Sequence, residues 1–373
     1  MKLNLDRHFV ALGLFALVVL NLVCHPIYAC TGITLTAKDG TVVYGRTLEW
    51  GSFSMKSRVM IIPRGYKFGG TTPEGLGKGH QWTAKYGMAG IELLENDILA
   101  DGMNERGLTL GLFYHPGFAE YKAYSPRRAA NSISIVDLGP YILGQCETVA
   151  EARKSLHKVD VIAVTHPVFG FPPPAHAIIT EPSGKAIVVE FLKGETVIYD
   201  APLGVITNSP TYDWHVTNLR NYVNLSPVAI PTKNVEDLDF SPLGGGSGMI
   251  GLPGDFTPPS RFVRAVAFSK SSRPTADGPE TIYEMFRILD SFNVPLGAAE
   301  GSDAAEEEAF NERSATIWTS ASDTRNRVFY FHTQHNRRVQ RVNLSKIDFG
   351  SLDEIKRVSF EKEQDIRDIT PKQ

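Results

Sequence analysis

The sequence predicts an α+β domain built on antiparallel sheets. Strand-like stretches dominate the chain after residue 29, a few helical stretches interrupt them, and no segment has the composition of an interdomain linker. Runs of strands followed by helices and again by strands are typical of layered α+β domains. We therefore expect one domain over residues 30–350, followed at 351–373 by a charged surface helix or loose tail.

The first expected element is a β-hairpin that begins at Cys30. Apolar and polar residues alternate over 33–36 and 42–44, on either side of a turn at 38–40. The same kind of pattern predicts further strands at 58–62, 90–94, 108–114, 161–164, 177–180, 186–192, 196–199, 203–207, 317–319, 328–331 and 339–343.

Helices are expected between these strands. They are predicted at 132–143, 148–157, 260–268 and 281–292. Thr148 and Ser260 are the expected N-caps of the second and third helix, because a hydroxyl there can accept from a free main-chain N–H. Segments rich in proline and glycine at 169–174, 241–254 and 295–301 are expected to be loops.

Composition excludes several classes of protein. Of the 373 residues 42% are apolar and 21% charged, which is typical of a globular chain with a large core. A net charge of −3 gives no reason to expect nucleic acid or an anionic membrane surface as partner. The three cysteines, Cys24, Cys30 and Cys146, do not form a disulfide framework. Two free thiols are expected after residue 29, with a bridge from Cys30 to Cys146 as the alternative.

Residues 1–29 have the pattern of a secretory signal peptide. A short basic start precedes an apolar run at 9–24, His25-Pro26 would break a helix, and Ala29 is a small residue before the cut. The alternative is a membrane anchor, but the run is shorter than the ~20 residues that span a bilayer. We therefore expect an exported protein, periplasmic or secreted, without a stable membrane anchor after cleavage.

Cleavage after Ala29 would leave Cys30 at the new N-terminus, which allows three interpretations. Cys30 could be lipidated, as in an anchored binding protein, although Tyr28 fits that motif poorly. It could be an enzyme's nucleophile, or it could be incidental. A free α-amine has a pKa of about 7.7–8.0, so it could take the proton of its own thiol without a histidine. The remaining site residues should then be orienting groups and oxyanion donors.

Four residues along the chain are candidates for those roles. Arg46 and Glu49 end the second strand of the hairpin, where they could stabilise the thiolate and hold the ammonium or the arginine. The alternative is an ion pair on an edge strand. Asn208 follows a predicted strand and could donate to an oxyanion, or merely satisfy its own turn. Arg261 lies near the start of a predicted helix, where the helix dipole disfavours a positive charge, which favours a functional role. The alternative is a surface arginine.

Metal and phosphate chemistry have no motif in this sequence. The ten histidines show no HExxH spacing, and no CxxC occurs. The glycine-rich stretch at 244–248 lacks the lysine of a P-loop and is expected to be a flexible loop. Neither a metal nor a cofactor is therefore expected.

Short motifs follow one another in an order that identifies a family. They are Cys30-Thr31-Gly32, Gly45-Arg46-Thr47-Leu48-Glu49-Trp50, Pro63-Arg64-Gly65-Tyr66, Asn104-Glu105-Arg106-Gly107-Leu108, the runs 207–215 and 218–222, and Gly251-Leu252-Pro253-Gly254-Asp255 with Ser260-Arg261-Phe262. In this series the sequence resembles the choloylglycine hydrolase family of N-terminal-nucleophile hydrolases, which includes bile salt hydrolases and penicillin V acylases. The resemblance extends over roughly residues 30–343.

The resemblance implies a fold, an activity and a set of roles. The fold would be a four-layer αββα sandwich, the activity hydrolysis of linear amide C–N bonds, and the assembly a homo-oligomer, possibly a tetramer. Cys30 matches the nucleophile, Arg46 the arginine beside it, Asn208 the oxyanion asparagine and Arg261 the active-site arginine. Glu49 stands where the family usually has aspartate, so its carboxylate reaches one methylene further.

One further position bears on the substrate. Tyr114 falls where bile salt hydrolases commonly have asparagine and penicillin V acylases have tyrosine. It would line the pocket, and its main-chain N–H could serve the oxyanion. This favours an acylase for a small N-acyl compound such as penicillin V or an acyl-homoserine lactone. A conjugated bile salt hydrolase is the alternative enzyme, and a lipid-anchored binding protein the alternative outside catalysis.

Overall fold

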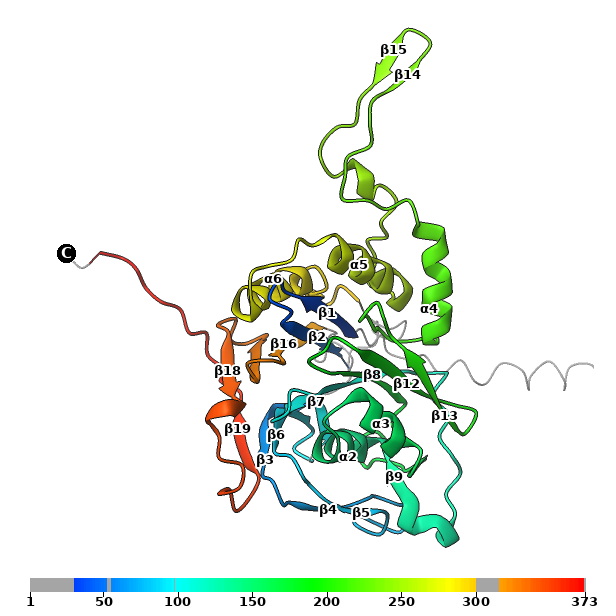
Figure 1. Cartoon of the computed structure of the whole chain (residues 1–373), viewed down its shortest axis with the longest axis vertical. Helices are drawn as coiled ribbons and strands as arrows, with labels where there is room; N and C mark the ends of the chain where they lie inside the picture. The colour runs from blue at the N-terminus through cyan, green and yellow to red at the C-terminus, as the bar shows by residue number, and fades with distance from the viewer. Residues whose placement is uncertain (1–29, 52–54, 97, 300–314, 372–373) are drawn as a thin grey trace, which may run out of the picture.

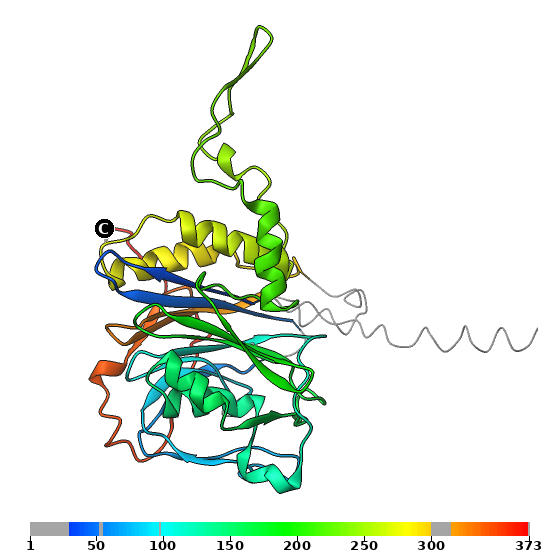
Figure 2. The same ribbon diagram turned by 45° about the vertical axis from the view of Figure 1, so that its right-hand side comes forward.

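The computed structural model describes residues 30–51, 55–96, 98–299 and 315–371, so the predicted signal peptide at 1–29 lies outside the described residues. Two antiparallel sheets face each other, and helices cover the outer face of each (Figure 1). The layers follow in the order helix, sheet, sheet, helix, as Figure 2 shows from the side. The predicted α+β class and the αββα sandwich are both confirmed.

The first sheet carries the N-terminal hairpin. Its strands lie in the order β1 (Cys30–Thr36), β2 (Val42–Trp50), β16 (Ala315–Asp323), β17 (Val328–Thr333) and β18 (Gln340–Asn343). The predicted hairpin is confirmed, because β1 and β2 pair antiparallel around a turn at 37–41. Placing β16 against β2 makes β2 an interior strand whose nine residues are all buried.

The second sheet is larger. Its strands lie in the order β13 (Glu195–Asp200), β12 (Ala186–Leu192), β11 (Ala175–Thr180), β8 (Thr109–Tyr114), β7 (Ile98–Asn104), β6 (Met88–Leu93), β3 (Arg58–Ile62) and β19 (Lys356–Ser359). The pairing of β11 with β8 brings His176 beside Phe113 and Ala175 beside Tyr114. Tyr114, at the C-terminal end of β8, lines one pocket together with Cys30 at the start of β1 and Glu49 near the end of β2.

Two pairs of helices form the outer layers. Helices α5 (Pro258–Ser271) and α6 (Gly278–Asp290) pack on β1, β2 and β16, and α2 (Leu138–Gln145) and α3 (Val149–Leu156) pack on the second sheet. Thr148 caps α3 as predicted, since its side chain accepts from the main-chain N–H of Glu151. Among the described residues no helix is both long and apolar enough to span a membrane.

The predicted helix at 132–143 is only partly correct. Residues Ser132–Ser134 form β9, which pairs in parallel with β10 (Asp160–Ile162), and the helix begins only at Leu138. A capping box between Ser134 and Asp137 starts the helical turn at this point. The predicted strand at 203–207 is likewise reduced to a single bridge between Ile206 and Gly32.

The expectation of a surface helix or loose tail after residue 350 is wrong for Lys356–Ser359. These residues form β19, which pairs with β3 at the edge of the larger sheet. All four side chains are exposed, so the strand lacks the alternating apolar pattern by which strands are recognised in a sequence. Main-chain hydrogen bonds hold it instead. Beyond it, the chain to residue 371 has no helix or strand. Glu361 and Asp365 still bond Asn336 and Arg338, and only the last residues run away from the body (Figure 1).

A long arm projects from the helical layer beyond α4 (Tyr212–Asn218), a helix that the sequence analysis did not predict. The arm spans residues 226–248, and its two ends meet where the Ser226 N–H donates to the Gly248 carbonyl. Its tip is the small hairpin of β14 (Lys233–Val235) and β15 (Leu238–Phe240), whose residues are all exposed. Part of this arm lies in the predicted loop at 241–254.

Candidate active site

The polar ends of β1 and β2 form one side of the candidate site. Cys30 lies opposite Leu48, and Gly32 lies opposite Arg46, so the hairpin alone brings the cysteine near Arg46 and Glu49. Both charged residues are buried on an interior strand. The alternative of an edge-strand ion pair is therefore wrong.

Cys30 is a buried free thiol, and Cys146 is also free, so the alternative of a bridge between them is wrong. Burial raises the pKa of the Cys30 thiol above its ordinary value. Arg46, the main-chain N–H of Glu49 and Arg261 act in the opposite direction. The predicted influence of Arg46 on the thiolate is correct in sign, but burial outweighs it. A thiol in this position needs a base to become a nucleophile.

Arg46 is held rigidly beneath the cysteine. Its Nη1 donates to the carbonyls of Ala100 on β7 and Leu112 on β8, two strands of the facing sheet. Its guanidinium lies 4.2 Å from the ring centroid of Phe113 and 5.0 Å from that of Trp318, so two aromatic faces enclose it. Arg46 is thus a fixed positive charge inside the protein rather than a mobile side chain.

Glu49 interacts electrostatically with Arg261 and Arg46, and its hydrogen bond goes to a threonine. Its Oε1 accepts from the Thr316 hydroxyl at 2.7 Å, and that hydroxyl accepts from the Val294 N–H at 2.9 Å. Its other oxygen, Oε2, is buried without a hydrogen-bond partner among the described residues. Burial raises the pKa of Glu49 to about 7, although Arg261 and the Thr316 bond oppose this. Glu49 can therefore carry or release a proton near neutral pH.

Asn208 links three separate parts of the site. Its Oδ1 accepts from the Cys30 main-chain nitrogen at 2.8 Å and from Arg261 Nη2 at 2.7 Å. Its Nδ2 donates to the carbonyl of Tyr114 at 2.7 Å. Because the side chain reaches across the site, the alternative that Asn208 satisfies only its own turn is wrong. Among the described residues, this is the one hydrogen bond that Nδ2 makes.

Arg261 reaches the same point from the opposite side of the first sheet. Its Nη1 donates to the carbonyl of Cys30 and, at 2.9 Å, to the Thr31 hydroxyl. The side chain is 1% exposed, so the alternative of a surface arginine is wrong. Burial lowers the pKa of Arg261 to about 10, with Glu49 and Cys30 opposing, and the guanidinium stays charged at neutral pH.

The predicted cap of the helix that carries Arg261 is wrong. Thr257 occupies the N-cap position of α5, and Pro258 and Pro259 begin the helix. Ser260 lies within the first turn and donates to Asp255. Proline fits the first turn because its missing N–H has no intrahelical acceptor there.

A glycine lets the segment that carries Asn208 approach the cysteine. Gly32 and Ile206 exchange two main-chain hydrogen bonds of 2.9 and 3.0 Å. A β-carbon on Gly32 would lie 2.7 Å from Phe113 Cζ and 2.9 Å from Ile206 Cγ2. Any larger residue would push this segment, and Asn208 with it, away from Cys30.

A pocket with about 600 Å³ of empty space opens from Cys30. Cys30, Arg46 and Glu49 are its polar end, and the rest of its wall is apolar: Leu48, Trp50, Met55, Leu93, Ile98, Ala100, Leu112, Phe113, Tyr114, Ile135, Val136, Phe169, Pro173, Pro174 and Ala175. The ring of Trp50 packs edge to face against those of Tyr114 and Phe169, with ring centroids 5.6 Å apart in each pair. Tyr114 thus lines the pocket as predicted.

The structure brings all six candidate residues together: Cys30, Arg46, Glu49, Tyr114, Asn208 and Arg261. Sequence reasoning missed the residues that orient them. Thr31 binds Arg261, Thr316 binds Glu49, and Phe113 and Trp318 enclose Arg46. No local pattern could have shown them, because Thr316 is 267 residues away from its partner and aromatic residues are common in any core.

Solved structures share this fold. A variant of the conjugated bile acid hydrolase from Clostridium perfringens matches with a TM-score of 0.79 at 28% identity, covering 91% of this chain and 100% of that chain. The fold of penicillin V acylase from Agrobacterium tumefaciens matches with a TM-score of 0.69 at 23% identity, covering 88% and 91%. The fold is that of the N-terminal-nucleophile hydrolases.

The sequence narrows this class to one family. The model of the linear amide C–N hydrolases, choloylglycine hydrolase family, matches residues 30–358, and the chain belongs to that family. The bile salt hydrolase/transferase of Clostridium perfringens is 31% identical over 345 residues, which are 91% of this chain and 99% of that protein. The penicillin V acylase of Pectobacterium atrosepticum is 25% identical over 328 residues, or 83% and 78%. The chain is accordingly a hydrolase of linear amides.

Proposed function

We propose that the chain is an exported amide hydrolase, periplasmic or secreted, in which removal of residues 1–29 exposes Cys30 as nucleophile and base. The observation that carries the proposal is the position of Cys30 at the polar end of the pocket, with its main-chain nitrogen bonded to Asn208. The thiol has a raised pKa. An α-amine with an ordinary pKa of about 7.7–8.0 is matched to deprotonating it near neutral pH.

The first half of the reaction forms an acyl-enzyme. The Cys30 amine takes the thiol proton, and the sulfur attacks the amide carbonyl to give a tetrahedral oxyanion. The second Nδ2 hydrogen of Asn208 donates to this oxyanion, and Arg46 and Arg261 supply a positive field around it. The C–N bond then breaks, and the leaving amine takes the proton from the Cys30 ammonium.

The second half releases the acid. The Cys30 amine, again neutral, accepts a proton from a water molecule that attacks the thioester carbonyl. The C–S bond breaks, the thiolate takes the proton back, and the carboxylic acid leaves. Glu49 and Arg261 surround the cysteine during these charge changes. The proposed steps need no metal or cofactor, which remains a prediction.

The pocket wall supports an acylase for apolar acyl groups. Trp50, Tyr114 and Phe169 present ring edges and faces that suit a phenoxyacetyl group or an acyl chain. We propose penicillin V and acyl-homoserine lactones as the substrate class on this ground. A conjugated bile salt hydrolase is the second candidate, because a relative that is 31% identical over 91% of this chain is named bile salt hydrolase/transferase.

A substrate panel tests this choice. Penicillin V, acyl-homoserine lactones, and glycine- and taurine-conjugated bile salts would be compared by kcat/KM under one set of conditions. Preference for the first two supports the acylase. A strong preference for conjugated bile salts would show that the aromatic wall does not select the substrate as proposed.

Mass spectrometry of the exported protein tests the N-terminus. A chain that begins with an unmodified Cys30 supports both export processing and the amine base. An acylated Cys30 would have no free amine, and it would favour the lipid-anchored alternative. Cleavage at another position would contradict the proposed activation step.

We also propose that the protein is a homo-oligomer, with a tetramer as the expected assembly, joined through the arm at 226–248. The arm exposes Val235, Leu238 and Phe240 at its tip and Leu243 beside it. Large apolar side chains gathered on a projecting hairpin are typical of an interface. The mass of the purified protein by light scattering would test this, and a monomer at micromolar concentration would contradict it.

A further inference from the structure

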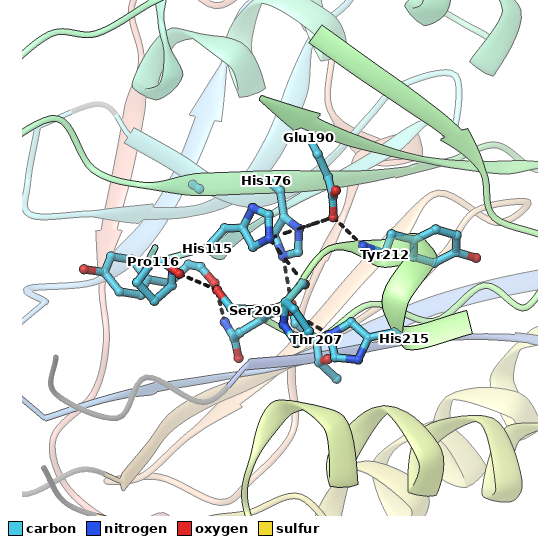
Figure 3. A network of polar contacts seen from close by, with 12 residues as sticks. His115, Pro116, His176, Glu190, Thr207, Ser209, Tyr212 and His215 are labelled. Atoms are coloured by element: carbon cyan, nitrogen blue, oxygen red, sulfur yellow. Dashed lines mark hydrogen bonds and ion pairs between the residues drawn. The ribbon is translucent and has the colours of Figure 1, made fainter. Parts of the chain in front are cut away.

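Three buried histidines each hydrogen-bond a different residue of the four-residue turn at 207–210, which carries Asn208. His176 Nε2 lies 2.9 Å from the carbonyl of Thr207, and His215 Nε2 lies 2.9 Å from that of Asn208 (Figure 3). His115 Nε2 lies 3.3 Å from the carbonyl of Pro210. The three rings come from three different elements, since His115 follows β8, His176 is on β11 and His215 is on α4.

The rest of the turn is also held. The Ser209 hydroxyl donates to the carbonyl of Pro116 at 2.7 Å, as Figure 3 also shows, and the Thr207 hydroxyl donates to that of Pro258 at 3.1 Å. Every residue from 207 to 210 therefore has at least one hydrogen bond to another part of the chain. Buried main-chain carbonyls need a donor, and here the donors come from three separate elements, so the turn is fixed from several sides at once.

The hydrogen bonds define the protonation of the rings. A carbonyl oxygen can only accept, so each of the three Nε2 atoms must carry the hydrogen. Burial lowers the pKa of His176 and His215 to about 4 and that of His115 to about 3, so the rings are neutral at neutral pH. A neutral ring with its hydrogen on Nε2 donates to the carbonyl without adding charge beside Cys30.

We propose that His115, His176 and His215 are positioning residues that fix Asn208 for catalysis. They act on its turn through main-chain carbonyls and touch neither the nucleophile nor the pocket. The inference rests on the proposed function, in which Asn208 donates to the oxyanion. A shift of the Asn208 amide by a fraction of an ångström would weaken both that bond and its bond to the Cys30 nitrogen.

Glu190 completes this arrangement. Its Oε1 accepts from the Tyr212 N–H at 2.8 Å and lies 3.3 Å from His176 Nδ1 (Figure 3). Because the hydrogen of His176 is on Nε2, its Nδ1 offers a lone pair, and the contact needs a proton from Glu190. Burial raises the pKa of Glu190 to about 7, which supports a neutral acid that donates to the ring.

The ionisable groups around Glu190 agree with a neutral carboxyl. His115, just after β8, and His176 on β11 face it, and Tyr199 and Asp213 lie near it on β13 and α4. None of these groups is a permanent cation. A carboxylate here would be buried without a full positive partner, whereas the acid form needs none.

The same residues do not suit a metal ion as they stand. Nitrogen and oxygen atoms of His115, His176 and Glu190 lie within 4.8 Å of one another. The rings of His115 and His176 are stacked, however, with centroids 4.1 Å apart and planes only 8° from parallel. Lone pairs of stacked parallel rings lie in two separate parallel planes and do not converge on one ion, and both Nε2 atoms already face carbonyls.

Paired substitutions separate positioning from structural support. Gln and Met have nearly the same length, but only Gln keeps a donor near the Nε2 position. We expect His215→Met to lower kcat about tenfold or more, with KM within about twofold, and His215→Gln to recover most of the loss. His332→Met is the matched control, since His332 is buried on β17 beside Phe286, and it should keep kcat.

Two results would overturn the proposal. One is an unchanged kcat for a folded His215→Met enzyme, and the other is an equal loss in the Met and Gln variants. If His215→Met does not fold, the same pair at His115 replaces it and is judged by the same criteria. Alkylation of Cys30 by iodoacetamide should proceed in each folded variant, because the thiol itself is untouched.

A second measurement does not depend on any substrate. In the nitrogen-15 spectrum of the histidine-labelled protein, these three rings should be neutral with the hydrogen on Nε2. Charged rings, or hydrogen on Nδ1, would overturn the proposal even if the substrate panel succeeds. If instead the wild-type protein hydrolyses none of the panel, the proposed function fails while the spectrum still judges the three histidines.

Discussion

The surroundings of Cys30 and the projecting arm are opposite kinds of structure in one chain. Around Cys30, charged and polar side chains that would normally face water are buried and bonded within the chain. On the arm at 226–248, large apolar side chains that would normally be buried are exposed. Each region reverses the usual distribution of polar and apolar side chains.

The two regions differ in whether their unusual side chains find partners within one chain. The polar site obtains its hydrogen-bond partners from β1, β8, α5 and the 207–210 turn of the same chain. The apolar arm has no comparable cover among the described residues. Activity should therefore respond to substitutions in the site, and assembly to substitutions in the arm, with little exchange between the two.

The largest effect is expected at the nucleophile. Cys30→Ala should lower turnover of any accepted substrate by about 10³-fold or more, because the sulfur forms the acyl-enzyme. Circular dichroism and the unfolding temperature should stay close to wild type, since the side chain is small. Cys146→Ala, at the other buried thiol, is the control and should keep activity. Substantial amidase activity in Cys30→Ala would end the proposed mechanism.

The next effect concerns the arginine fork. Arg261 binds the Cys30 carbonyl, Thr31 and Asn208 together, which a single ammonium cannot do. Arg261→Lys should lower kcat/KM by about 10²-fold. The matched control is Arg264→Lys on the same helix, since Arg264 bonds main-chain carbonyls away from the cysteine. Equal losses for the two variants would indicate a general packing effect instead.

A smaller effect is expected in the pH dependence of stability. Because burial raises the pKa of Glu190 to about 7, its contribution to folding is fully present below its ordinary pKa and is lost as pH rises through 7. Glu190→Gln stays neutral at every pH. The difference in free energy of unfolding, variant minus wild type, should therefore be about 1–3 kcal/mol larger at pH 8 than at pH 5.

Chemical denaturation at the two pH values measures this difference. Glu236→Gln, at the exposed tip of the arm, is the control and should show the same small change at both pH values. A Glu190→Gln protein that loses stability selectively at pH 8 would mean that Glu190 is a carboxylate paired with a charged His176.

The smallest effect on catalysis is expected from the arm. Replacing Leu238 and Phe240 by Ser should reduce the oligomer to smaller species, because the exposed apolar surface is removed. The kcat per chain should stay within about twofold of wild type. Light scattering and the amidase assay measure the two properties on one sample. Ser at Asn234 and Asp239, a polar pair on the same hairpin, is the control. An unchanged oligomer would exclude the arm as the interface.

Local sequence determined the hairpin and the three candidate residues on it. The turn at 37–41 returns the chain within a few residues, so Cys30, Arg46 and Glu49 must lie close together whatever the rest of the fold is. The order of short motifs identified the family, and with it Asn208, Arg261 and Tyr114. Hydrogen bonds within a turn act over a few residues, which is the reason that such features can be predicted from the sequence.

Tertiary structure alone decided how the site is held. Asn208 reaches Cys30 across 178 residues and Arg261 across 231, and Thr316 reaches Glu49 across 267. The three histidines meet one turn only because the end of β8, the start of β11 and the helix α4 lie beside it. β19 pairs through its main chain without an apolar pattern. These contacts follow from sheet order and register, and no local spacing of residues encodes them.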